Sequence, residues 1–491
     1  MKKYLRFFIW IAFFIEIIAF QQLENCIGAI ISLLIFEIFM NYVYLKNNIK
    51  NYPLSIFALS ALFAFCYLPI IMTLIDGHPL TFKMEKPERT FFYQLLFVLV
   101  SVFAFACSKN SRIEYFVKKT MKKGIFLKPL TEKQIWVLTG FGFCFQIYTL
   151  LMVEDNGGGG IAATLSYFIY LPLIYLFKGW GYDNIRMNKL YVYLYIVLVM
   201  ILGIGTNKRS YVFMIVFFYL LSYLLNSFIK KYEFSFKSFL TGIGIFLIAS
   251  GPITDFALSM VLVRSLKGET STEELVQKTI DTFNNKELLT TAKNVFFSDK
   301  ETGNVYESWN EYYVNNLFLE RYCNYRVADA TLCNAYKAGF CNIKMQEYFW
   351  WFIGSSFPTP ILKIFGNRVD KTKYEEFSTN DMLMKQSYGR IAGGHMVGGD
   401  VGLGLATMGE LFFLIHFCVF YVIFSVLNGM CLRKNDKTIF LPIASLLLLN
   451  RIFRLFVFDD GIALDIRFII WELPFYLVCY MIIVKIIRKL S

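Results

Sequence analysis

The sequence predicts an all-α, polytopic membrane protein, and three observations lead to that fold class. First, 57% of the 491 residues are hydrophobic, 19% are aromatic and only 17% are charged, which is more apolar surface than a soluble core needs. Second, apolar runs near the roughly 20 residues that an α-helix needs to cross a bilayer recur along the chain. Third, one long stretch, from Arg264 to Asp400, cannot lie in a bilayer and has apolar segments on both sides.

The apolar runs predict about twelve transmembrane helices in two groups. Residues 1–263 contain helices 1 to 9, residues 264–400 form one large loop with amphipathic helices, and residues 401–491 contain helices 10 to 12. The first run follows a charged start but has no small-residue cleavage site, so we expect a retained helix. The predicted helices are Leu5–Phe20, Cys26–Leu45, Leu54–Ile75, Phe91–Cys107, Ile135–Val153, Ile161–Phe177, Leu190–Gly205, Tyr211–Ile229, Phe239–Val263, Gly402–Leu427, Thr438–Phe458 and Phe468–Ile487.

Basic residues are concentrated in alternate connections between these helices, whereas Gln21–Asn25 and Glu154–Gly160 contain none. The positive-inside rule therefore predicts cytoplasmic termini and an external 264–400 loop. The same rule accounts for the net charge of +13, so we expect no nucleic-acid partner. The basic residues assigned to the cytoplasm are Lys2, Lys3, Arg6, Lys46, Lys50, eight residues within Lys109–Lys133, Lys178, Arg186, Lys189, Lys230, Lys231, Lys237, Arg433, Lys434, Lys437, Lys485, Arg488 and Lys489.

Several classes of site are not indicated. The chain shows no internal repeat of the kind found in many secondary transporters, and the Gly157–Gly160 run lacks the lysine of a phosphate-binding loop. Three of the ten cysteines, Cys323, Cys333 and Cys341, fall in the large loop, where one disulfide and one free thiol are compatible with an oxidising compartment. They have no neighbouring histidine, so we expect no metal and no cofactor.

A short basic turn lies between two middle helices. Lys208 and Arg209 must both lie at the outer membrane surface, which the positive-inside rule disfavours. Two interpretations remain open. The long side chains snorkel to lipid headgroups, or they bind an anionic headgroup such as a diphosphate, whose oxygens the guanidinium contacts in pairs.

The large loop contains two further patterns. Asn315–Phe340 has the apolar spacing of an amphipathic helix and carries Arg321, Arg326 and Asp329, which are either solvated or paired charges or the border of a cleft. Glu347–Gly366 follows with Trp350, Trp351, Phe352 and the helix-interrupting residues Pro358 and Pro360. We expect this stretch to lie in the membrane interface, with stacking on sugar rings as a second role.

His395 is the candidate general base, because an unperturbed histidine titrates near neutral pH. Four nearby glycines leave the backbone open to a bulky ligand, or alternatively allow the next helix, with Gly402 and Ala406, to pack closely. We expect His416 to be a packed core residue and His78 a loop residue. The four glycines are Gly393, Gly394, Gly398 and Gly399.

Charge returns to the same outer face near the C-terminus. Arg451 and Arg454 lie near the outer end of a predicted helix. We expect the charged residues that follow to pair with one another or to cap the last helix; they are Asp459, Asp460, Asp465 and Arg467. Asp255 and Glu410 are ionisable residues at membrane depth, which makes each a candidate for a functional role.

The order of these motifs resembles the Wzy-type oligosaccharide repeat-unit polymerases, also called O-antigen polymerases. The resemblance covers Leu190 to about Leu427 and is carried by TNKRSYVF, LERYCNYRVADA, FPTPILK and RIAGGHMVGGDVGLGLATMGELFF. It implies a metal-independent, GT-C-like glycosyltransferase that uses undecaprenyl diphosphate-linked sugars at the outer face of the bacterial inner membrane. The products would be O-antigen of lipopolysaccharide or capsule, and a chain-length regulator and a flippase of the same pathway would be partners.

The resemblance also implies roles for individual residues. Arg209 and Arg321 would hold the diphosphate, Lys208, Arg326 and Arg390 would assist, and His395 would activate the acceptor hydroxyl. Met396 follows the histidine where related O-antigen ligases often have Asn or Ser. Three alternatives stay open: an O-antigen ligase, a flippase or other transporter of lipid-linked oligosaccharide, and a scaffold of a polysaccharide assembly complex.

Overall fold

The structure, a computed structural model, is almost entirely α-helical in the part of the chain that it describes. One antiparallel pair of short strands, β1 (Leu432–Asn435) and β2 (Thr438–Phe440), is the exception. This confirms the all-α class. The described residues are 2–152, 165–177, 187–205, 209–230, 251–263, 272–297, 313–314, 323–357, 362–363, 369–374, 377–389, 396–435, 438–456 and 461–490.

The N-terminal helices closely match the predicted segments. The chain forms α1 (Lys2–Ala19), α2 (Leu23–Ile38) with the π-helical turn η1 (Phe39–Val43), α3 (Lys46–Asn51), α4 (Pro53–Ile75) and α5 (Pro87–Ser108). Pro53 and Pro87 each occupy a first helical position, where a missing N–H costs nothing and the fixed φ favours the helix. Proline therefore sets where both long helices begin.

The middle of the chain contains long helices and one broken segment. The long ones are α8 (Glu132–Met152), α11 (Lys189–Gly205) and α12 (Arg209–Lys230), preceded by the short α6 (Arg112–Met121) and α7 (Gly124–Leu127). The single helix predicted for Ile161–Phe177 is wrong over its described part. Residues there form a 3₁₀ turn, η2 (Ser166–Tyr170), followed by a one-turn helix, α10 (Leu171–Ile174), because Pro172 cannot continue a hydrogen-bonded run.

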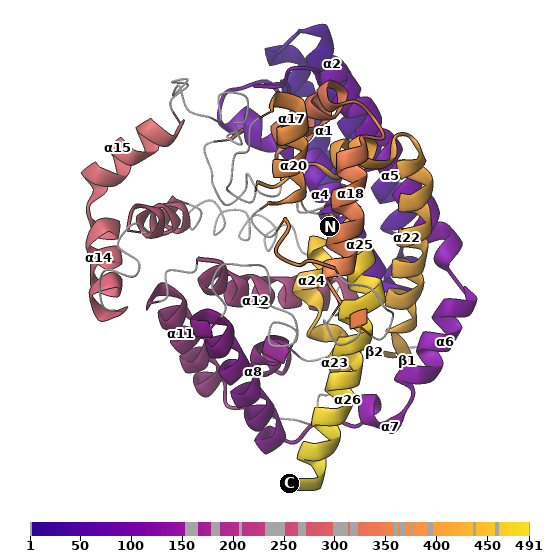
Figure 1. Ribbon diagram of the computed structural model, residues 1–491, viewed down its shortest axis with the longest axis vertical. Helices are drawn as coiled ribbons and strands as arrows, with labels where there is room; N and C mark the ends of the chain where they lie inside the picture. The colour runs from indigo at the N-terminus through magenta and orange to yellow at the C-terminus, as the bar shows by residue number, and fades with distance from the viewer. Residues whose placement is uncertain are drawn as a thin grey trace.

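The helices of the large loop form two separate groups. The helices α14 (Thr272–Asn284) and α15 (Lys286–Phe297) lie to one side in Figure 1, away from α17 (Tyr325–Ala338), α18 (Ile343–Ser355) and α20 (Thr379–Tyr388). The helix predicted within 315–340 begins at Tyr325, since the Asn324 side chain caps it by accepting from the Val327 N–H. Residues 315–322 lie outside the described part.

Two predicted C-terminal helices are wrong as single elements. In place of Gly402–Leu427 the chain forms α21 (Asp400–Met408) and α22 (Leu411–Gly429), separated at Gly409, whose φ of 60° is a left-handed value that glycine adopts readily. In place of Thr438–Phe458 it forms β2, α23 (Ile443–Leu446), α24 (Leu449–Phe453) and the 3₁₀ turn η4 (Arg454–Phe456). Residues 440–450 are buried throughout, which is where interrupted helices are tolerated at membrane depth.

The last predicted helix is part of a longer one. The elements α25 (Ile462–Arg467), η5 (Phe468–Glu472) and α26 (Leu473–Leu490) follow without a gap, and η5 is a π-helical turn just before Pro474. A π-helical turn places its side chains differently from an α-helical one and often marks a functional site. Here it brings Glu472 to the side of α24, as described below.

Five helical stretches among the described residues are long and apolar enough to cross a membrane. This supports a membrane-embedded protein. In Figure 1 two of them, α5 and α22, run side by side at the right of the molecule, and α4 packs against both. The five are Leu23–Val43, Pro53–Ile75, Pro87–Ser108, Leu411–Gly429 and Ile462–Leu490.

Candidate functional site

The structure describes two of the six residues singled out for binding or catalysis. Arg209 is the first residue of α12, although its side chain is not described, and Arg326 lies in the first turn of α17, partly buried. The other four lie outside the described residues: Lys208, Arg321, Arg390 and His395.

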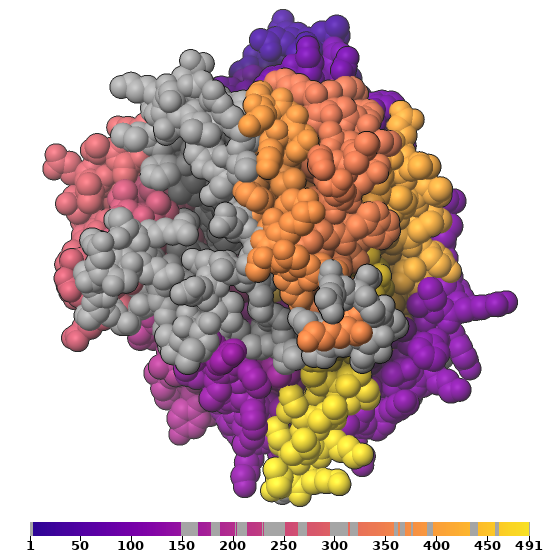
Figure 2. All heavy atoms as spheres, in the orientation of Figure 1, coloured from indigo at the N-terminus to yellow at the C-terminus, as the bar shows by residue number. Residues whose placement is uncertain are grey.

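Four helices that precede α22 pack into one unit. α17, α18, α20 and α21 contact one another and share a buried core, and in Figure 2 α17, α18 and α20 form a continuous face at the upper centre of the molecule. We call these four helices the loop unit. Its buried core residues are Ala335, Met345, Tyr348, Met382, Leu383, Leu403 and Ala406.

Gly402 allows α21 to lie directly on α17. A Cβ atom at Gly402 would stand 2.6 Å from the backbone carbon of Thr331, which no side chain permits. Ala406, one turn further along α21, is completely buried. The close-packing interpretation of these small residues is therefore confirmed at Gly402 and Ala406.

The residues directly after His395 are held by the loop unit. The Ser378 hydroxyl donates to the Met396 carbonyl at 2.7 Å, and the Asn380 side-chain amide donates to the Val397 carbonyl at 3.2 Å. The Gly399 N–H in turn donates to the Thr331 hydroxyl at 3.0 Å. α17 and α20 thus fix the backbone that follows the histidine.

Of the six candidates, Arg326 lies on a helix of the loop unit, and two more fall in the sequence between α20 and α21. Arg326 is on α17, Arg390 follows Gly389 at the end of α20, and His395 precedes the anchored residue Met396. A cavity of about 20 Å³ lies against Gly399 and Asp400 and is also lined by Gln94. That volume holds about one water molecule, so the cavity is too small for a sugar.

Asp329, on the same helix as Arg326, has a structural role. Its carboxylate is 1% exposed and accepts from the backbone N–H groups of Glu85 and Lys86 and from the Thr90 hydroxyl. Burial raises the pKa of Asp329, while these hydrogen bonds oppose that shift. The carboxylate caps the N-terminus of α5, which has no cap of its own, and so fastens the loop unit to that helix.

A second buried carboxylate has a comparable role. Glu16 on α1 is fully buried and accepts from the Asn25 amide and from the Leu80 N–H, both at 2.7 Å. The Asn25 carbonyl oxygen accepts from the Thr81 N–H at 3.2 Å. Glu16 and Asn25 thereby tie α1 and α2 to the connection between α4 and α5.

A cluster of charged residues joins α24 to the π-helical turn. Arg451 lies 3.7 Å from Asp465 and 3.6 Å from Glu472, while Arg467 lies 2.9 Å from Glu472. Arg451 also donates to the Leu464 carbonyl at 3.0 Å. We call Arg451, Arg467, Asp465 and Glu472 the arginine cluster. Asp465 and Arg467 are ion-paired, but with Arg451 and Glu472 and not with each other, so the pairing predicted between them is wrong. Glu472 is a member that the sequence did not indicate, and Asp459 and Asp460 lie outside the described residues.

Aromatic rings from the loop unit and the last helix surround the arginine cluster. Arg451 lies 4.8 Å from the centre of the Phe468 ring, and Arg467 lies 5.9 Å from that of Phe352, on α18. Trp350, by contrast, is 68% exposed, as expected of a residue in a membrane interface. The aromatic stretch of α18 therefore has both an exposed side and a side that covers the arginines.

The direction of α12 relative to the segment before it can be read from aromatic contacts. Tyr170 contacts Met214 and stacks on Phe218, while Phe177, later in the chain, packs on Tyr219. Since the two segments therefore run in the same direction, the α12 end that begins at Arg209 lies on the side of residues before Tyr170.

One of those earlier residues connects this end to the arginine cluster. Tyr167 lies within electrostatic reach of Arg451, Arg454, Arg467 and Glu472. Phe217 and Phe453 also pack together, which places α12 against α24 directly. α12, which begins at Arg209, therefore packs against the helix that carries Arg451.

The two remaining histidines have the expected structural roles. His416 is buried in α22 and shares a hydrogen bond of 2.8 Å with the Ser101 hydroxyl, which confirms a packed core residue. His78 lies in the turn after α4 and stacks on Phe82 with ring centres 3.8 Å apart, which confirms a loop residue. Neither is placed to accept a proton from a substrate.

Other candidates also have partners or different positions. Asp255 forms an ion pair with Lys293 on α15, and Glu410 is the N-cap residue of α22 at the break after α21. All three loop cysteines, Cys323, Cys333 and Cys341, are free thiols, so the disulfide that their number allowed is not formed.

Comparisons with protein-family models, with curated proteins and with solved structures give no match for this chain. The fold and the arginine cluster define an α-helical, membrane-embedded protein with a charged site beneath a helical loop unit. Any narrower class rests on the chemistry of that site.

Proposed function

We propose that the protein is a polymerase that joins undecaprenyl diphosphate-linked oligosaccharide repeat units into O-antigen or capsule. It would act as a GT-C-like glycosyltransferase with about twelve transmembrane helices in the bacterial inner membrane, with the loop unit outside. The observation that supports the proposal is that the loop unit carries Arg326 and packs Phe352 against Arg467 of the arginine cluster. Arg390 and His395 lie between α20 and α21 in the sequence.

The proposed reaction forms one bond and breaks another at the same carbon. The hydroxyl of a lipid-linked acceptor unit, deprotonated by His395, attacks the anomeric carbon of the growing chain. A glycosidic bond forms, the bond to the lipid diphosphate breaks, and the diphosphate leaves with the bonding electron pair. The proton stays on His395 until it passes to solvent.

Arginine side chains would stabilise the leaving group. Arg209 and Arg321 would hold the diphosphate oxygens, with Lys208, Arg326 and Arg390 nearby, as negative charge develops on them. Arg451 and Arg467 would add to the positive field if the diphosphate extends toward α24, against which α12 packs through Phe217. With these positive side chains around the diphosphate, the proposed reaction would not require a metal ion.

The test is the surface glycan of a deletion strain complemented with the wild-type chain. A polymerase predicts single repeat units on the lipid in the deletion strain and a ladder of longer chains after complementation. Long polymer that stays unattached to its final acceptor would instead identify an O-antigen ligase. Absence of any repeat unit at the outer face would identify a flippase.

Substitutions then test the residues. His395→Ala, Arg209→Ala and Arg321→Ala should each abolish the ladder, whereas Arg209→Lys should retain part of it because the charge remains. Lys286→Ala, at an exposed residue of α15, is the matched control and should leave the ladder intact. Protein amounts are compared by immunoblot. A full ladder from both arginine variants would contradict the diphosphate role.

A further inference from the structure

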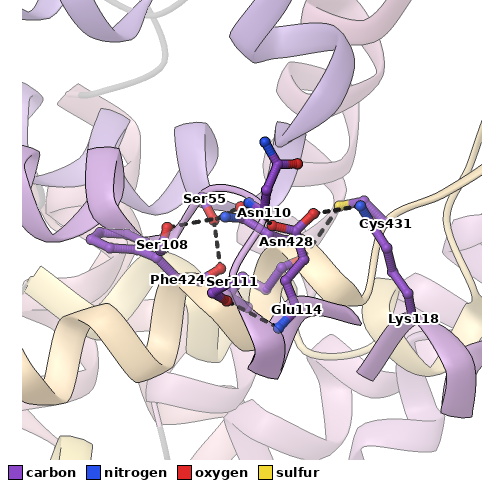
Figure 3. Close-up of polar contacts among 10 residues, drawn as sticks. Ser55, Ser108, Asn110, Ser111, Glu114, Lys118, Phe424, Asn428 and Cys431 are labelled. Atoms are coloured by element: carbon purple, nitrogen blue, oxygen red, sulfur yellow. Dashed lines mark hydrogen bonds and ion pairs between the residues drawn. The ribbon is translucent and has the colours of Figure 1, made fainter. Parts of the chain in front are cut away.

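A buried polar network fixes one end of three membrane-spanning helices. The Ser55 hydroxyl on α4 donates to the side-chain oxygen Oδ1 of Asn428 on α22 at 2.6 Å. The side-chain amide Nδ2 of Asn428 in turn donates to the Ser108 hydroxyl on α5 at 3.1 Å (Figure 3). All three residues are fully buried. α5 therefore ends at a defined point, Ser108, and α6 begins four residues later at Arg112.

The connection to α6 is equally fixed. Asn110 has a φ of 59°, which turns the chain, and the Ser111 hydroxyl caps α6 by accepting from the Glu114 N–H at 3.1 Å. The Glu114 carboxylate, 2% exposed, accepts from the Asn110 N–H at 2.7 Å and pairs with Lys118 (Figure 3). α6 is held in one orientation by these contacts.

α6 also presses closely on α22. A Cβ atom at Gly429 would stand 2.5 Å from the Cβ of Val117, so only glycine allows this approach. Glu114, Val117, Lys118 and Met121 follow the i, i+3, i+4, i+7 pattern of one helix face, and Glu114 and Met121 are buried. The opposite face of α6 is therefore turned away from the bundle.

That opposite face combines exposed aromatic rings with basic residues. Tyr115 is 73% exposed and Phe116 is 69% exposed. We call the exposed residues of α6 and its C-terminal end the α6 face; they are Arg112, Tyr115, Phe116, Lys119, Lys122 and Lys123. The face carries four positive charges, and the acidic residue of the helix, Glu114, is on the buried side.

Neighbouring elements extend the positive charge. Lys128 and Lys133 are exposed beyond α6. α7 packs against the end of α26, where Arg488 donates to the Ile125 carbonyl at 3.3 Å and Lys485 and Lys489 are exposed. Figure 1 shows α6 and α7 at the lower right, beside α26.

We propose that the α6 face binds the anionic phospholipid headgroups of the leaflet at this end of the bundle. The distribution of lysine and arginine assigns this end to the cytoplasm, where anionic lipids make the surface negative. Exposed aromatic rings are unfavourable in water but favourable at the headgroup boundary, and the lysines around them complement phosphate. The position supports this occupant, since α6 starts where α5 and α22 leave the membrane. The proposal does not depend on the proposed polymerase activity.

The test uses the full chain purified in a mild detergent. Phosphatidylglycerol added to the micelles should raise the melting temperature of the wild type, and phosphatidylcholine should not. Lys119→Glu/Lys123→Glu should lose this difference, whereas Lys119→Arg/Lys123→Arg should keep it. The matched control, Lys286→Glu/Lys373→Glu, makes the same charge change at exposed residues elsewhere and should keep it too.

Three outcomes would overturn the proposal. The first is an equal effect of phosphatidylcholine, and the second is an undiminished effect of phosphatidylglycerol on the Lys119→Glu/Lys123→Glu variant. The third is an equal shift from soluble glycerol phosphate, which would identify a site for a free phosphate group in place of a lipid. Tyr115→Ser/Phe116→Ser provides an independent variant without a charge change, and it should weaken the lipid effect.

Discussion

Two regions of the molecule bury charged side chains and surround them differently. At the start of α5, the carboxylate of Asp329 accepts only from neutral donors, two backbone N–H groups and the Thr90 hydroxyl. In the arginine cluster, charges face charges. Arg451 stands 3.7 Å from Asp465 and 3.6 Å from Glu472, beyond the roughly 2.7–3.2 Å of a hydrogen bond.

The difference separates a structural charge from one available for function. A carboxylate whose oxygens are occupied by fixed backbone donors has little capacity for a ligand, and its removal leaves those donors buried without partners. Arg451 instead faces two carboxylates, and its planar guanidinium also suits an anionic ligand such as a phosphate group. We therefore expect substitutions at Asp329 to act on stability and substitutions at Arg451 to act on activity.

The largest effect on stability is expected from Asp329→Ala. Three donors lose their acceptor at roughly 1–3 kcal/mol each at most, so we expect a loss on the order of 3 kcal/mol in the free energy of unfolding. Asp329→Asn keeps one acceptor oxygen and should lose less. The melting temperature in detergent is the measurement.

The control for that experiment is Glu347→Ala on α18, which removes an exposed ion pair with Lys344. It should leave the melting temperature nearly unchanged, because exposed pairs contribute little. If Asp329→Ala were as stable as this control, the capping role of Asp329 would be refuted.

Arg451→Met should reduce polymer formation by more than its loss of stability explains. The variant loses the hydrogen bond to the Leu464 carbonyl and leaves the buried Asp465 without this counter-charge, while Arg467 still neutralises Glu472, so stability falls as well. The glycan ladder, normalised to the amount of protein, should nevertheless disappear. Arg451→Lys keeps the charge and should retain a partial ladder.

A full ladder from Arg451→Met would show that the arginine cluster is structural, like the contacts of Asp329. The contrast between the two regions would then have to be abandoned. A ladder reduced only in proportion to the amount of folded protein would lead to the same conclusion, since stability alone would account for it.

Much of the helical layout could be predicted from the sequence. The apolar run predicts a helix over Leu54–Ile75, and the structure has one over Pro53–Ile75. The two agree because a long apolar run is helical throughout, and a proline at its start favours the first helical position. The break at Gly409 and the short helices after β2 could not be predicted. Hydrophobicity measures burial, and an interrupted helix buried in protein is as apolar as a continuous one.

At the site, the sequence indicates which residues are charged but not which partners they contact. That charged residues near the C-terminus form ion pairs could be predicted, but their partners could not, since Asp465 pairs with Arg451 and Arg467 pairs with Glu472. The contact of Asp329 with Glu85 and Lys86 could not, since nothing in a single sequence relates positions so far apart. An uncapped α5 terminus was the one available signal that such a partner exists.

Ser378→Ala tests an intermediate case, a structural contact next to the candidate base. The Ser378 hydroxyl accepts from the Asp381 N–H as the cap of α20 and donates to the Met396 carbonyl, one residue after His395. We expect a loss of about 1 kcal/mol in stability, as is typical of a helix cap. We also expect a shorter glycan ladder, because the backbone beside His395 is less firmly held.

Ser387→Ala, near the end of the same helix, is the matched control, since its hydroxyl donates within α20, to the Met384 carbonyl. Equal ladders from the two variants would mean that anchoring of Met396 does not contribute to activity, and the role of the loop unit in positioning His395 would fail.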